Sequence, residues 1–140
     1  MRKTLFRCKL KDSGEWIYWD MLGRITTRFG KISKHTIKRK AGESHYFFAH
    51  QLWNIMDRAT VGECVGLKDG FKNLIFEGDI LVGPFFEDDD GYGVVSWING
   101  GWEVKSEHVG CPLNERSGSM QYDILGNVHD NPELLGGADV

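Results

Sequence analysis

Closely spaced turn signals divide the second half of this 140-residue chain into short apolar segments. Glu77-Gly78-Asp79 leads into Ile80-Leu81-Val82, and Asn99-Gly100-Gly101 separates Tyr92–Ile98 from Trp102-Glu103-Val104. An Asn-Gly pair between two runs of strand-forming residues is a strong short-range signal for a β-hairpin. This rhythm predicts a mainly β fold, α+β at most. We expect a small, strongly bent sheet or an SH3-like, partly open barrel with short helical segments.

Three more segments of this half are predicted to be strands: Ala59–Val65, Leu74–Phe76 and Gln121–Val128. The region between the first two, Gly66–Asn73, is predicted to be a turn. Asp69 and Asp79 lie in turns, where a carboxylate commonly accepts hydrogen bonds from its own backbone, and that local role explains both without catalysis. After the last strand, Asn131 is placed to cap a helical turn with Pro132 at its first position.

The N-terminus predicts a β-hairpin. Thr4–Leu10 and Glu15–Met21 are rich in strand formers, and Lys11-Asp12-Ser13-Gly14 between them is a turn cluster. The second strand holds Trp16, Tyr18 and Trp19, which a stacking platform for bases would also require. Packing is the favoured interpretation, because aromatic cross-strand pairs stabilise short sheets.

The segment at about 23–44 differs from the rest of the chain. Its apolar residues follow neither a strand nor a helix period, and residues 23–42 contain no acidic side chain. We predict an irregular, insertion-like segment whose cations are candidate nucleic-acid or partner contacts. These residues are Arg24, Arg28, Lys31, Lys34, Lys38, Arg39 and Lys40. A solvated loop that pairs with acidic residues elsewhere is the favoured alternative.

Residues 44–57 fit two structures. Phe48, Leu52, Ile55 and Met56 recur at helical spacing behind Ser44, a good N-cap residue, so a short amphipathic helix is one reading. A strand pair is the other, because Tyr46-Phe47-Phe48 is good strand material.

Composition and charge limit the class of protein. The chain is 41% hydrophobic and 26% charged, which is typical of a soluble globular protein, and we expect one domain over residues 1–140. The net charge of −3 is divided unequally: residues 1–60 sum to +8 and residues 61–140 to −11. Such a division favours contact between oppositely charged parts, within one molecule or between subunits, over binding of a polyanion.

No apolar stretch is long enough to span a bilayer, and the three cysteines suit a reducing cytoplasm.

Residue patterns that would carry chemistry are weak. His45 and His50 are five residues apart, one more than a helical metal pair requires, and Cys8, Cys64 and Cys111 are widely spaced. Asp88-Asp89-Asp90-Gly91 lacks the spacing of a calcium loop. Neither a Gly-x-Ser-x-Gly motif nor a phosphate-binding loop is present. We therefore expect no catalytic residue, no metal and no cofactor.

Five phrases follow one another in a specific order along the chain: Phe6-Arg7-Cys8-Lys9, Trp16-Ile17-Tyr18-Trp19-Asp20, Gly66-Leu67-Lys68-Asp69, Ile75-Phe76-Glu77-Gly78-Asp79-Ile80 and Leu125-Gly126-Asn127-Val128-His129-Asp130-Asn131-Pro132-Glu133-Leu134-Leu135. Their wording and order resemble those of the YopX-like family of phage and prophage proteins. The resemblance implies a small, mainly β protein of unknown function in the cytoplasm of a bacterial host. The segment at 23–44 matches no part of that pattern.

Together these features favour a non-enzymatic accessory protein that binds itself or an unidentified phage or host protein. Nucleic-acid binding through Arg24–Lys40 is the alternative, and a metal-dependent hydrolase is the least favoured reading. No membrane partner is expected.

Overall fold

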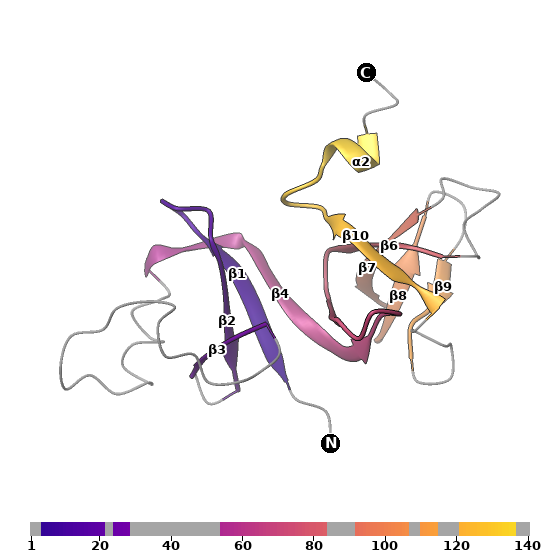
Figure 1. Cartoon of the computed structure of the whole chain (residues 1–140), viewed down its shortest axis with the longest axis horizontal. Coiled ribbons are helices and arrows are strands. Elements are labelled where there is room, and N and C mark those ends of the chain that lie inside the picture. The colour runs from indigo at the N-terminus through magenta and orange to yellow at the C-terminus, as the bar shows by residue number, and fades with distance from the viewer. Residues whose placement is uncertain are drawn as a thin grey trace. The chain divides into compact units, whose positions relative to one another are not determined.

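The protein is mainly β, as predicted, and it divides into two compact units. The computed structural model describes residues 4–21, 24–28, 54–83, 92–106, 110–114 and 121–136. The units are Met1–Cys64 and Val65–Val140, and a single domain over the whole chain stays a prediction. The strands and the short helix (Figure 1) are β1 (Leu5–Leu10), β2 (Trp16–Asp20), β3 (Ile25–Thr26), β4 (Met56–Lys68), β5 (Leu74–Phe76), β6 (Asp79–Val82), β7 (Tyr92–Ile98), β8 (Gly101–Lys105), β9 (Gly110–Pro112), β10 (Asp123–Asn127) and α2 (Glu133–Gly136).

The predicted N-terminal hairpin is confirmed. β1 and β2 pair antiparallel around the turn at residues 11–13, and they belong to a five-stranded sheet with the order β3-β2-β1-β4-β5. On one face Phe6 stacks on Trp19 with ring centroids 5.7 Å apart, and Trp19 packs against the buried Ile17. These contacts agree with packing, not an open stacking platform, as the role of the aromatic residues.

A buried cation lies on the opposite face of this hairpin. The guanidinium carbon of Arg7 is 4.5 Å from the centre of the Trp16 ring, and Lys9 Nζ is 5.9 Å from the same ring. Arg7 is only 2% exposed. The electron-rich face of an indole is a favourable place for a cation removed from water. Trp16 therefore helps to stabilise Arg7 inside the unit.

The structure differs from two predictions for the middle of the N-terminal unit, Met1–Cys64. Ile25–Thr26 was expected to be irregular but forms β3, because both residues are buried and pair with Trp19 and Tyr18. Within the predicted helix or strand pair at 44–57, Asn54 and Ile55 are helical, whereas Met56 already begins β4 and pairs with Leu10. Residues 44–53 lie outside the described part of the chain.

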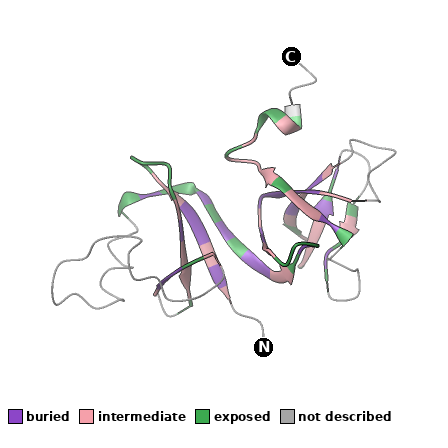
Figure 2. Cartoon of the chain, in the orientation of Figure 1, coloured by how far each residue is buried: buried purple, intermediate pink, exposed green. Residues whose placement is uncertain are grey.

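β4 is longer than the predicted strand Ala59–Val65 and includes residues expected to form a turn. Buried and exposed residues alternate from Thr60 to Cys64 (Figure 2), and Val65, which follows Cys64, is also buried. This break in the alternation lies at the boundary between the units. Opposite β1 the register shifts between Arg7 and Lys9, where the Lys9 backbone N–H donates to Thr60 Oγ1 at 2.8 Å. A side chain thus replaces a ladder acceptor at the bulge.

The second sheet contains five antiparallel strands in the order β10-β6-β7-β8-β9. The predicted segments at Ile80–Val82, Tyr92–Ile98 and Trp102–Val104 are strands of this sheet, and the strand predicted at Gln121–Val128 is the shorter β10. The predicted strand at Leu74–Phe76 is β5 of the first sheet, and β9 was not predicted. Within the described strands neither sheet closes into a barrel, so the bent-sheet alternative describes the fold.

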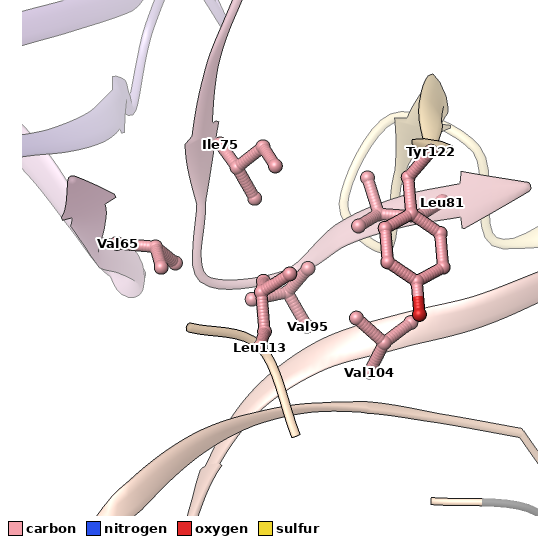
Figure 3. Packing of buried hydrophobic residues seen from close by; sticks show 7 residues of the cluster. All are labelled: Val65, Ile75, Leu81, Val95, Val104, Leu113 and Tyr122. Carbon is pink, nitrogen blue, oxygen red and sulfur yellow. The ribbon is translucent and has the colours of Figure 1, made fainter. Parts of the chain in front are cut away.

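The core of the second unit is built from residues of many segments. Their side chains point toward one another (Figure 3): Val65, Ile75, Leu81, Val95, Val104, Leu113 and Tyr122. The largest is Tyr122, which is fully buried. Because Tyr122 immediately precedes β10, its burial brings the C-terminal strand onto the rest of the unit.

Candidate functional site

Of the seven basic residues predicted as nucleic-acid or partner contacts, the structure describes two, Arg24 and Arg28. Arg24 Nε lies 2.8 Å from Asp20 Oδ2, and the backbone N–H of Arg24 donates to Asp20 Oδ1 at 2.9 Å. This pair closes the turn between β2 and β3. Arg28 is half-buried. The other five candidates, Lys31, Lys34, Lys38, Arg39 and Lys40, lie outside the described residues.

Asp69 organises the loop between β4 and β5, as the sequence predicted. Its Oδ1 accepts hydrogen bonds from the backbone N–H of Phe71 at 2.9 Å and of Asn73 at 2.8 Å. Its Oδ2 accepts from the backbone N–H of Ile124 on β10, at 3.2 Å and 55 residues away. The carboxylate is 1% exposed. It therefore serves both the local turn and a distant strand.

Asp79 has a similar local role. Its Oδ2 accepts from the backbone N–H of Phe76 at 2.8 Å, across the tight turn that contains Gly78. Gly78 adopts a φ of 88°, a left-handed conformation that favours glycine. The prediction that both aspartates bond their own backbone is confirmed.

Asn131 holds the other end of β10. Its backbone N–H donates to the Asn127 carbonyl at 2.8 Å, and its side-chain Oδ1 accepts from the Asn127 N–H at 3.2 Å. The Asn131 carbonyl accepts from Leu134 N–H at 3.1 Å, as expected at the start of a helical turn. The predicted position is thus confirmed, but the side chain bonds back to β10. Gly126 is needed here, because a β-carbon would overlap with Asn131 Oδ1.

These contacts cover the free side of β10, which is the end strand of its sheet. Asp69 accepts from the N–H of Ile124, and Gly70 N–H donates to the Tyr122 carbonyl at 2.8 Å. Asn131 occupies both backbone groups of Asn127. An end strand with unsatisfied backbone groups is a template for pairing with another chain. Here the loop from Asp69 and the residue Asn131 close that edge.

The opposite edge of the sheet, at β9, is also a poor template for strand addition, for a different reason. β9 has three residues, and its last one, Pro112, lacks a backbone N–H. Short strands and proline both make a sheet edge a poor template for strand addition. Neither edge of this sheet therefore favours strand pairing with a partner.

A pair of tryptophans at the end of the β7–β8 hairpin is the most notable exposed apolar feature. Trp97 and Trp102 are register partners whose ring centroids are 5.0 Å apart in an edge-to-face arrangement. Trp102 packs against the core cluster, whereas Trp97 is 56% exposed. We call these two residues the tryptophan pair. The pair was not predicted, although the symmetric placement of both tryptophans about Asn99-Gly100 is a sequence signal for a cross-strand contact.

Two titratable side chains of the core, Cys8 and Tyr122, have raised pKa values. Burial, with a smaller effect of Asp57, raises the pKa of the Cys8 thiol to about 12. Burial and the nearby Cys111 raise the pKa of Tyr122 to about 12. All three cysteines are free thiols. Across the described ranges, no three His, Cys, Asp or Glu side chains group as metal ligands would.

Comparisons with known proteins give one result on identity. The model of the family described as YopX protein matches residues 5–136 and thus spans both units. A search of curated proteins found no match. Among the described residues, no helix is long and apolar enough to cross a membrane. Because the family model covers almost the whole chain, this protein belongs to the YopX family.

Proposed function

We propose that this chain is a non-enzymatic binding protein that associates with copies of itself, the acidic unit of one copy facing the basic unit of another. The observation that carries the proposal is the position of the charge reversal. Residues 1–64 hold 13 Lys/Arg and 6 Asp/Glu, a net +7, and residues 65–140 hold 4 and 14, a net −10. The charge therefore changes sign at the structural boundary between the units.

Opposite net charges on two units of one chain favour association of two chains. Each copy offers a basic and an acidic surface, so two copies related by a two-fold axis make the same favourable contact twice. Complementary potentials also accelerate the encounter and disfavour misaligned arrangements. These effects weaken with salt, because the screening length falls from roughly 30 Å at 0.01 M to about 8 Å at 0.15 M.

The two buried aspartates support a binding role over a catalytic one. Among the residues of the acidic unit that the structure describes, the almost fully buried carboxylates are Asp69 and Asp79, and both accept backbone hydrogen bonds in turns. A catalytic carboxylate needs access to a substrate. These two groups are instead committed to holding loops and strands in place.

We further propose that the protein acts as a phage or prophage accessory protein in the cytoplasm of a bacterial host. Three free thiols suit a reducing compartment. Isolation of tagged protein from cells, with alkylation of free thiols before lysis, tests the compartment. Full alkylation of the denatured chain is expected, and recovery of disulfide-linked chains would contradict it.

Sedimentation equilibrium of the purified full chain at several salt concentrations tests self-association. We expect dimers or larger species at about 10 mM salt that dissociate as ionic strength rises. Protein that stays monomeric at every concentration tested at low salt would show that the proposal is wrong. Nuclease treatment distinguishes the alternative partner: a large species that falls to the monomer mass with nuclease is bound to nucleic acid, and self-association is then wrong.

A further inference from the structure

We propose that the tryptophan pair is the contact surface of the acidic unit, and that its occupant is the basic N-terminal unit of a second copy. This inference rests on the proposed self-association and names the surface that makes the contact.

The sheet edges direct a partner to a face of the sheet. On β10, the hydrogen bonds from Ile124 to Asp69 and between Asn127 and Asn131 use the backbone groups that an added strand would require. On β9, Pro112 supplies no N–H. Strand addition is one of the common ways in which β proteins bind extended segments. Because neither edge of this sheet favours strand addition, a side-chain surface is the favoured route to this sheet.

Trp97 is held in position before any partner arrives. It lies on a strand, its ring contacts Trp102, and Trp102 in turn packs against the buried core. Phe71 is more exposed, at 73% against 56%, but it lies in the bend that Asp69 organises. A rigid aromatic side chain loses little conformational freedom on binding. Tryptophan is also the residue type most enriched among those that dominate binding energy.

The face of Trp97 suits a cationic side chain. A guanidinium or ammonium group is attracted to the face of an indole ring, and more strongly when water is excluded. The same chain already uses this contact, since Arg7 lies 4.5 Å from the centre of the Trp16 ring. Aliphatic stems of Lys and Arg also cover apolar surface. A basic partner can therefore place a cation on the face of the Trp97 ring and at the same time neutralise part of the negative charge of the acidic unit.

The occupant follows from charge. The acidic unit, at −10, repels a second acidic unit and attracts the N-terminal unit, which has 13 Lys/Arg and a net charge of +7. A second copy therefore provides the complementary surface that Trp97 requires. The arrangement is reciprocal in a two-fold dimer.

The test replaces Trp97 in the full chain with Ala and, separately, with Thr, which retains a strand-forming residue. Phe71→Ala is the matched control, because it removes an exposed aromatic side chain from the same unit. Sedimentation equilibrium at low salt gives the dissociation constant. We expect both Trp97 variants to raise it at least about tenfold and Phe71→Ala to leave it within about twofold. Circular dichroism and urea midpoints confirm that each variant folds.

The outcomes separate this inference from the proposed function. If the wild type dimerises at low salt and the Trp97 variants dimerise with the same affinity, the assignment of the surface is wrong. Self-association would still stand. An equal loss in Phe71→Ala would also overturn it, because the effect would not be specific to the tryptophan pair. A wild-type monomer at low salt overturns the proposed function itself.

Discussion

At the scale of single residues, Asp69 connects its own loop with a distant strand of the acidic unit. One buried carboxylate accepts backbone hydrogen bonds from Phe71 and Asn73 in its own loop and from Ile124 on β10. Asp69 ends the family-like phrase at 66–69, and its partner Ile124 immediately precedes the family-like phrase at 125–135. Their shared role is structural.

Replacing Asp69 with Asn tests this role. The amide oxygen can accept from two of the N–H groups, but the new NH₂ group then faces a backbone donor in a site that is 1% exposed. A buried unsatisfied donor costs about 1–3 kcal/mol, so the free energy of unfolding should fall by that amount. Urea titration measures it. The control is Asp123→Asn on β10, a half-buried carboxylate, for which we expect a change within about 0.5 kcal/mol.

Tyr122 predicts how stability depends on alkaline pH. An unfolded tyrosine ionises near pH 10, whereas burial and Cys111 raise the pKa of Tyr122 to about 12 in the folded protein. Between these values the unfolded chain has released a proton that the folded chain keeps. The contribution of this group is therefore complete below pH 10 and is lost as pH rises toward 12.

The measurement compares urea unfolding of the wild type and Tyr122→Phe from pH 8 to about 11.5. The stability of the wild type relative to the phenylalanine variant should decrease above pH 10, because only the wild type carries this titrating group. All other ionisable side chains are the same in both proteins, so their contributions cancel in the difference. A constant difference across the range would contradict the raised pKa of Tyr122.

At the scale of elements, the turn between β7 and β8 positions the tryptophan pair. Asn99 and Gly100 have φ values of 51° and 83°, the left-handed pair expected of a two-residue hairpin turn. A β-carbon at Gly100 or at Gly101 would meet no atom within 4 Å. The two glycines therefore differ in backbone conformation and not in available space.

This difference gives a matched pair of variants. Gly100→Ala forces a side chain into the left-handed region and should lower the free energy of unfolding by about 1–2 kcal/mol. Gly101→Ala, whose φ is not positive, should change it by no more than about 0.5 kcal/mol. Thermal or urea unfolding of both measures the difference. Equal effects would show that the turn does not depend on the conformation of Gly100.

The elements that were predicted correctly have local signals. The Asn99-Gly100 turn, the turn at Glu77-Gly78 and the N-terminal hairpin each depend on residues close together in sequence. β3, β9 and the extension of β4 were missed because they form by pairing with strands that supply the partner groups. The closure of β10 by Asp69 joins residues 55 apart. A single sequence shows Asp69 as a turn residue and gives no sign of its second partner.

At the scale of the whole molecule, sequence and structure place one boundary in nearly the same position. The charge pattern changes sign near residue 60, and the structural units meet at Cys64 and Val65. β4 runs through that boundary without a linker. The family model also spans it. The change of sign therefore falls within a strand and not in a loop between two elements.

Two lysine variants with equal net charge test whether this division drives association. Lys11→Glu lowers the basic unit from +7 to +5, and Lys105→Glu changes the acidic unit from −10 to −12; both take the chain from −3 to −5. Both lysines are exposed. If opposite units meet, Lys11→Glu weakens the dimer and Lys105→Glu strengthens it, by several-fold each at about 10 mM salt. Sedimentation equilibrium measures both constants. Repulsion that depends only on net charge would weaken both dimers equally, so the opposite signs of the two effects distinguish contact between unlike units from a general effect of charge.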